Sequence, residues 1–83
     1  MSADAAGVAP VMTQTLSRVD ELTPREREVA QLAARGLSSR RIGETLVIAE
    51  KTAANHLQNA LDKLDVHSRS ELAARAVELG LLP

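Results

Sequence analysis

An all-α fold of four short helices is predicted by three features of this sequence. Apolar side chains recur three and four positions apart, which is the period of an amphipathic helix. Capping residues precede the apolar segments and glycines follow them. The core must be aliphatic, because 45% of the 83 residues are hydrophobic and none is aromatic. A chain of this length forms one domain, and its small core leaves little stability to spare. A second copy or a neighbouring domain is therefore expected to add stability.

The N-terminal residues differ from the rest in composition. Residues 1–15 are mostly small side chains without a helical stripe, which is typical of a flexible arm or linker remnant. We therefore expect residues 1–21 to be such an arm and residues 22–83 to form the folded domain.

The first helix is predicted to begin at Pro24. Thr23 can accept a hydrogen bond from the N3 amide, Pro24 suits the first helical position, and Glu26 can complete a capping box. Leu22, just before the cap, is placed to pack onto the first turn. Gly36 can adopt the left-handed conformation that ends the helix.

A second, short helix is predicted after Ser38, which can cap it. Its expected inward positions are Ile42, Gly43 and Leu46. A glycine inside a helix costs about 1 kcal/mol relative to alanine, so Gly43 suggests that another helix backbone passes close by. Residues 47–49 are too few for a paired strand and form a tight connection, so a helix-turn-helix is expected.

The third predicted helix runs from Glu50 to Leu64 and has two different sides. Its apolar residues recur every three or four positions and are expected to face the core. They are Ala53, Leu57, Leu61 and Leu64. The other side is rich in amides, which lower helix propensity but suit the edges of DNA bases. A neutral, solvent-facing surface is the alternative interpretation.

The fourth helix is predicted after Ser68, with Glu71 completing a second capping box. Asp65 ends the preceding helix where glycine would fit more easily, and Gly80 ends the fourth. The four helices have expected lengths of about 12, 8, 15 and 11 residues. Residues 81–82 are expected to fold over the end of the core. The inward residues of the fourth helix are predicted to be Leu72, Ala73, Ala76, Val77 and Leu79.

Composition excludes several classes of protein. The absence of cysteine rules out a disulfide or a thiolate metal site and fits a reducing cytoplasm. No apolar run approaches the roughly 20 residues that cross a bilayer. His56 and His67 have no nucleophile partner or cluster of ligands, and no glycine-rich phosphate loop is present. We expect neither an enzyme nor a bound metal, cofactor or small-molecule ligand.

The net charge of −1 opposes nucleic-acid binding by bulk electrostatics. Residues 1–22 hold one basic and three acidic side chains, whereas residues 23–83 hold nine basic and eight acidic ones. The predicted domain is therefore near neutral, and its affinity per copy should be modest even if its positive groups share one face.

Several segments of the sequence resemble the LuxR/FixJ type of helix-turn-helix DNA-binding domain. They are 22–29 (LTPREREV), 36–38 (GLS), 42–46 (IGETL), 50–52 (EKT), His56 and 63–69 (KLDVHSR). Their order and spacing match over residues 22–82, which is far more specific than one helix-turn-helix pattern. Sigma factor region four shares the helix-turn-helix but lacks the pattern at 63–69.

The resemblance implies a bacterial transcription regulator of the LuxR family. Its third helix would enter the major groove of double-stranded DNA, the second would cross above it, and the fourth would pair two copies. The chain resembles either the effector domain of a response regulator or a stand-alone regulator. The arm at residues 1–21 is then either a linker remnant or, by analogy, an arm for the minor groove.

The resemblance also implies a set of DNA-binding residues. Residues 51–52 match the opening of the recognition helix, where phosphates are contacted, and residues 38–39 match the start of the second helix, whose amides favour a phosphate. His56 either donates to a phosphate or packs against the second helix, and Lys63 would reach the DNA backbone further along. With the outward side of the third helix added, the predicted set is Ser38, Ser39, Lys51, Thr52, Ala54, Asn55, His56, Gln58, Asn59 and Lys63.

The sequence departs from the family pattern at the recognition helix. Ala49 replaces a common capping Ser, at a cost of about 1 kcal/mol. Ala53 and Ala54 replace a usual Val-Lys pair, which removes a positive side chain from the predicted groove-facing surface and should lower DNA affinity. Asp65 for Gly and Arg41 for Glu are milder changes.

The fourth helix is the expected dimer interface. Glu71, Ala74, Arg75 and Glu78 alternate in charge around a small residue, which suits ion pairs between two antiparallel copies. Ion pairs within one copy are the alternative. The expected partners are promoter DNA, a second copy and RNA polymerase. The alternative function, motivated by residues 49 and 54 and the net charge, is a degenerate helix-turn-helix that serves as a protein interaction or dimerisation module.

Overall fold

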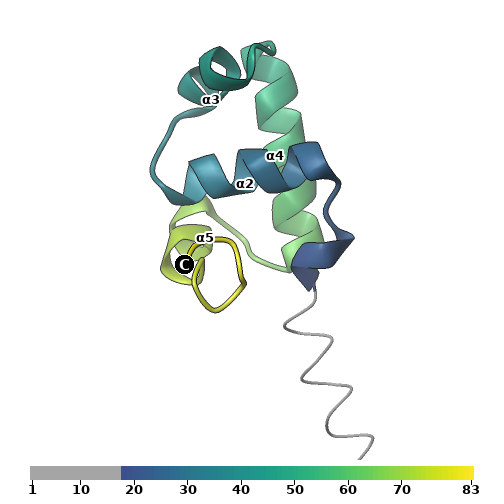
Figure 1. The fold of residues 1–83 in the computed structure, drawn as a ribbon, viewed down its shortest axis with the longest axis vertical. Coiled ribbons are helices and arrows are strands. Elements are labelled where there is room, and N and C mark those ends of the chain that lie inside the picture. The colour runs from purple at the N-terminus through teal and green to yellow at the C-terminus, as the bar shows by residue number, and fades with distance from the viewer. Residues whose placement is uncertain (1–17) are drawn as a thin grey trace, which may run out of the picture.

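The computed structural model describes residues 18–83, and the greater part of the expected arm, residues 1–17, lies outside them. A 3₁₀ turn, η1 (Arg18–Glu21), precedes four helices, and no strand occurs in this part of the chain. The helices are α2 (Pro24–Ala34), α3 (Ser39–Leu46), α4 (Glu50–Leu64) and α5 (Arg69–Ala74). The all-α prediction is confirmed. α2 crosses the middle of α4, while α3 and α5 lie toward opposite ends of α4 (Figure 1).

The core is aliphatic and draws on every α-helix. The largest fully buried side chains are Val29 of α2, Ile42 of α3, Leu64 of α4 and Leu72 of α5. Because each helix places one of these side chains in the same cluster, removing any helix would expose part of a shared core.

The caps predicted at both ends of α2 and at the start of α3 are confirmed. Thr23 Oγ1 accepts from the Glu26 N–H at 3.1 Å, and the Thr23 N–H donates to Glu26 Oε1 at 3.0 Å, which completes the capping box. Ser38 Oγ accepts from the Arg41 N–H at 3.2 Å. Gly36, with φ of 99°, ends α2 in the left-handed region.

The packed part of the chain begins earlier than the sequence predicts. Val19 and Leu22 are only 9% and 7% exposed and belong to the core. The Arg27 guanidinium donates to Val19 O at 3.3 Å and to Asp20 Oδ1 at 3.1 Å. Residues 18–21, assigned to the arm from the sequence, therefore form η1 against the domain. One turn is too short to give a periodic apolar pattern, so the sequence carried no signal for it.

The fourth helix is shorter than predicted. α5 comprises six residues, and the chain leaves helical geometry at Arg75, with φ of −106° and ψ of 9°. The turns that follow bring Leu79 and Leu81 into the core, each 3% exposed, while Val77 is 67% exposed. The predicted inward orientation of Val77 is wrong because the turns change the periodicity after α5. That of Ala73 is also wrong: it lies within α5 but is exposed, and Leu72 is the residue that this short helix buries.

Candidate nucleic-acid interface

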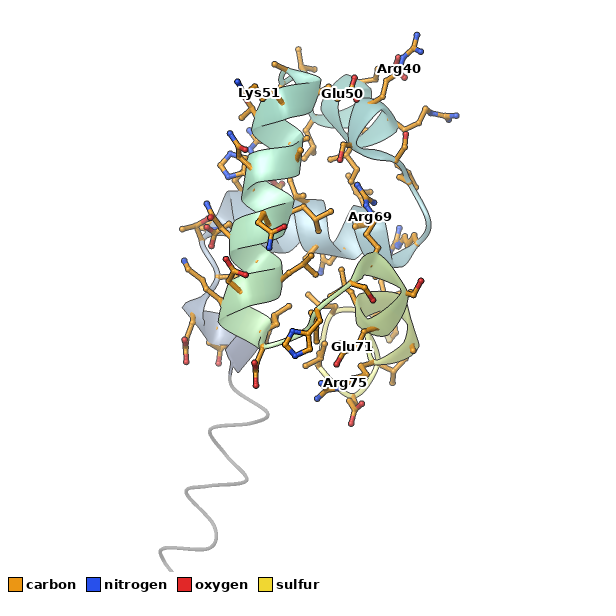
Figure 2. All side chains as sticks on the ribbon, turned by 180° about the vertical axis from the view of Figure 1, so that it is seen from behind. Arg40, Glu50, Lys51, Arg69, Glu71 and Arg75 are labelled. Atoms are coloured by element: carbon orange, nitrogen blue, oxygen red, sulfur yellow. The ribbon has the colours of Figure 1, made fainter. Side chains whose placement is uncertain are left out.

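α4 has the two sides that the sequence predicts. Its buried side consists of Ala53, Leu57, Ala60, Leu61 and Leu64. Its exposed residues include Lys51, Thr52, Ala54, Asn55, Gln58 and Asn59. His56 is half-buried between the two sides. Figure 2 shows α4 in front of α2, with α3 and α5 to one side, so these helices leave the outer side of α4 uncovered.

Gly43 fixes the approach of α3 to the start of α4. A Cβ at this position would lie 2.6 Å from Ile48 O and 3.3 Å from the Glu50 nitrogen. The Ile48 N–H also donates to Gly43 O at 2.9 Å. The close backbone predicted from Gly43 is therefore present. It belongs to the turn that leads into α4, however, and not to the body of another helix.

Val47 ends α3 in a strained conformation. It has φ of 58° and ψ of 50°, and its side chain is 88% exposed. A β-branched residue is a true outlier in the left-handed region. Since the exposed side chain gains little from packing, the fit of α3 to α4 at Gly43 must hold the turn in this shape.

Positive side chains gather where α3 and α4 meet. Arg40 and Arg41 both approach Glu44, at 3.5 Å and 3.8 Å, and all three side chains are more than half exposed. Lys51 is exposed in the first turn of α4, and Figure 2 shows it at the same end of the molecule as Arg40 and Glu50. These three basic and two acidic side chains give the α3–α4 end a formal charge of +1, whereas the whole chain has a net charge of −1. The sequence pattern did not single out Arg40 as a binding residue, because an arginine in a short helix is also an ordinary solvated side chain.

The start of α3 is tied to α5. Arg69 Nη2 donates to Ser39 Oγ at 2.6 Å, and Arg69 Nη1 donates to Leu37 O at 2.9 Å. Ser39 is half-buried, whereas its neighbour Ser38 is exposed. The sequence did not predict this contact of Arg69, and its only signal was the place of Arg69 at the end of the 63–69 segment.

The amides of α4 are exposed, but one has a partner within the helix. Gln58 Nε2 donates to Asp62 Oδ1 at 3.1 Å. Such an exposed contact one turn along a helix stabilises it by roughly 0.2–0.5 kcal/mol, so Gln58 can exchange it for another acceptor at little cost. Asn55 and Asn59 lie exposed on either side of Gln58 along the helix.

Lys63 is held by the fold. Its Nζ donates to Glu26 Oε1 at 2.8 Å and to Glu21 O at 3.3 Å. Glu26 is only 5% exposed, and the hydrogen bond from Lys63 lowers the pKa of its carboxyl, outweighing the opposite effect of burial. The sequence predicts that Lys63 contacts DNA. In the described chain its ammonium instead bonds a buried carboxylate, and a buried charge is costly without a partner. A contact of Lys63 with DNA would compete with this bond and stays a prediction.

Only half of the capping box predicted for Ser68 and Glu71 forms. Ser68 Oγ accepts from the Glu71 N–H at 3.0 Å, as predicted. Glu71 Oε1, however, accepts from the His67 N–H at 2.8 Å and not from that of Ser68. The His67 N–H is the main cause of a lowered pKa of the Glu71 carboxyl.

The expected dimer surface, formed by Glu71, Ala74, Arg75 and Glu78, carries its own ion pairs. Arg75 Nε donates to Glu78 Oε1 at 3.0 Å, and Arg75 Nη1 to Glu71 Oε2 at 3.4 Å. The Glu78 contact is the main cause of a raised pKa of Arg75. Figure 2 shows Glu71 of α5 next to Arg75, the residue that directly follows α5. Pairing of two copies through this surface stays a prediction.

Comparison with known proteins identifies the family. Residues 20–76 match the family described as bacterial regulatory proteins, luxR family. The chain belongs to this family. The LuxR-type helix-turn-helix prediction is thereby confirmed, and with it the class of DNA-binding transcription regulators. The match begins at residue 20, within η1, in agreement with the packing of this segment against the LuxR domain.

Individual relatives agree with the family match. The LuxR domain is 46% identical to the transcriptional regulatory protein DegU of Brevibacillus brevis over 59 residues, which are 71% of this chain and 25% of DegU. It is 41% identical to the spore germination protein GerE of Bacillus subtilis over 61 residues, 74% of this chain and 82% of GerE. It is 44% identical to the transcriptional regulatory protein LiaR of Bacillus subtilis over 57 residues, 69% of this chain and 27% of LiaR.

The chain thus spans 25% of DegU but 82% of GerE. No solved structure matches the chain significantly. Within residues 18–83, no helix is long and apolar enough to cross a membrane. The same residues contain no group of three or more His, Cys, Asp or Glu side chains placed to hold a metal ion.

Proposed function

We propose that this LuxR domain binds promoter DNA in a sequence-specific manner, with α4 in the major groove. The observation that carries the proposal is the division of α4 into a buried apolar side and an exposed side with Asn55, Gln58 and Asn59. The major groove of B-DNA admits an α-helix. The side-chain amide of one Asn or Gln can make two hydrogen bonds to one adenine, at N6 and N7. These three residues are the proposed base readers.

Phosphate contacts would surround this helix. Lys51 and Thr52 lie in the first turn of α4, and Ser38 caps the N-terminus of α3. Arg40 and Arg41 lie on the exposed side of α3. If the three cations each neutralise one phosphate, log K should fall with log salt with a slope of about −3 per copy. Ser39, Ala54 and His56 complete the proposed interface, with His56 beside the base readers.

We further propose that two copies bind together through the surface of Glu71, Ala74, Arg75 and Glu78. The exposed side chain of Val77 supplies an apolar group beside it. The two α4 helices would then enter half-sites about one helical turn, or roughly 34 Å, apart. A promoter-bound dimer has RNA polymerase as a further candidate partner, and the position of the operator decides between activation and repression.

A degenerate helix-turn-helix that serves as a protein interaction module is the alternative. Ala49 offers no side-chain cap to α4, Ala54 offers no cation, and the chain has a net charge of −1. This alternative expects pairing of copies without sequence-dependent DNA binding.

Selection from a random duplex library followed by titration distinguishes the two functions. The wild type should prefer the selected duplex to a shuffled duplex at fixed salt. N55A/Q58A should lose that preference but keep its affinity for the shuffled duplex, because phosphate contacts are unchanged. R25Q is the control, since Arg25 pairs with Glu28 on α2, outside the proposed interface. Equal affinity of the wild type for both duplexes would refute sequence-specific binding.

A further inference from the structure

Arg69 joins two parts of the domain that are distant in sequence. It is the first residue of α5, and its guanidinium bonds Leu37 O at 2.9 Å and Ser39 Oγ at 2.6 Å. Figure 2 shows its side chain reaching from α5 toward α3. The start of α3, where the proposed phosphate contacts lie, is therefore held by the helix that carries the proposed dimer surface.

The chemistry of this contact fixes the direction of the Ser39 hydroxyl. A guanidinium has only donors, whereas a serine hydroxyl has one hydrogen and two lone pairs. Ser39 Oγ must therefore be the acceptor, and its own hydrogen is left to point elsewhere. In the described chain this hydroxyl donates to no other protein atom. Accepting from a cation also polarises the hydroxyl and strengthens it as a donor.

We propose that Arg69 is a positioning residue for DNA binding, which holds the Ser39 hydroxyl so that it donates to a phosphate oxygen of the duplex. A DNA phosphate oxygen is an acceptor and receives such contacts from serine side chains and helix N-termini. This inference rests on the proposed function and adds how the first turn of α3 is set. Arg69 itself does not touch the DNA in this arrangement.

The salt dependence of binding separates positioning from direct contact. An arginine that neutralises a phosphate contributes about one unit to the slope of log K against log salt. A hydroxyl contact contributes nothing to that slope. Removing Arg69 should therefore weaken binding at every salt concentration without changing the slope.

The test measures affinity for a mixed-sequence duplex over a range of KCl for the wild type, S39A, R69Q, S39A/R69Q and R69K, with R25Q as control. Circular dichroism confirms that each variant is folded at the titration temperature. S39A and R69Q should each weaken binding by about tenfold, the effect of one hydrogen bond to a charged group. The double variant should be no weaker than either single variant, and all slopes should equal that of the wild type. R69K keeps a donor and should retain part of the affinity, while R25Q should bind like the wild type.

Three results would overturn the inference: a slope for R69Q smaller by about one, losses that add in the double variant, or full affinity in a folded R69Q. If R69Q does not fold, S39A and R69K decide, because full affinity of S39A contradicts the proposal and partial retention by R69K with loss in S39A supports it. A wild type that binds no duplex at all refutes the proposed function and this inference together. A wild type that binds while S39A binds equally well refutes this inference alone.

Discussion

Replacing Lys63 with methionine should destabilise the LuxR domain although the position is partly exposed. Methionine keeps the apolar stem but removes the ammonium from Glu26, whose side chain is 7% exposed. Breaking a fully buried pair costs roughly 3–5 kcal/mol. The Lys63 side chain is 38% exposed, so water screens part of the interaction. We expect a loss of about 2 kcal/mol, which lowers the Tm of a domain of this size by roughly 8–16 °C.

The loss should depend on pH in one direction. Lys63 lowers the pKa of Glu26 below its ordinary value of 4.5. A carboxyl with a lowered folded pKa stabilises the fold above its unfolded pKa, and that stability disappears as the pH falls through the folded pKa. The difference between the wild type and K63M should therefore be largest at neutral pH and should shrink as the pH falls below 4.5.

Thermal unfolding followed by circular dichroism at neutral and acidic pH measures this difference. K51M is the matched control, because it removes the same charge from an exposed position of α4 and should change stability by no more than about 0.5 kcal/mol. The double variant E26Q/K63M should recover part of the loss, since no buried charge remains. Equal Tm values for K63M and the wild type, or a difference that does not change with pH, would refute the reasoning.

Three further substitutions test the helix-turn-helix itself. G43A should destabilise the domain by about 1–3 kcal/mol in chemical denaturation, since a Cβ would lie 2.6 Å from Ile48 O; unchanged stability would mean that the turn is not tightly packed. V47N should raise stability by about 1 kcal/mol, because Asn tolerates the left-handed region better than Val, and a lower Tm would contradict the strain assigned to Val47. A54K should steepen the salt dependence of DNA binding by about one unit, and an unchanged slope would place residue 54 away from the phosphates.

The helix boundaries were predictable because their signals are local. Thr23 and Glu26 lie three residues apart, and the capping box forms as the sequence indicates. Gly36 and Asp65 end their helices in the left-handed region, with φ of 99° and 59°. Each of these residues acts through backbone groups within one turn, so the sequence contains the whole interaction.

The polar contacts that tie the helices together were not predictable. Lys63 and Glu26 are 37 residues apart, and Arg69 and Ser39 are 30 residues apart. Each of these side chains has an equally ordinary role at the surface, and only the packing of the helices decides which partner it meets. The sequence therefore predicted Lys63 as a DNA contact and gave no role to Arg69.

The end of the chain shows how competing contacts override a helical pattern. The apolar residues from Leu72 to Leu79 fit one helix, yet α5 ends at Ala74. The turns after it allow Leu81 to be buried at 3% exposure beside Leu79, with Val77 exposed instead. Burial of a leucine contributes about 1.5–3 kcal/mol, and helical periodicity does not contain this contribution from a residue beyond the helix.

Side-chain amide resonances of Asn55, Gln58 and Asn59 test the central claim most directly. In an ¹⁵N-resolved NMR titration of the LuxR domain with its selected duplex, these three NH₂ groups should shift strongly and saturate together with the backbone amides at the start of α4. The buried leucines of α4 should keep their positions in the core. If the three NH₂ groups stay unchanged while the largest shifts fall on α2, then α4 does not enter the duplex and the account is wrong.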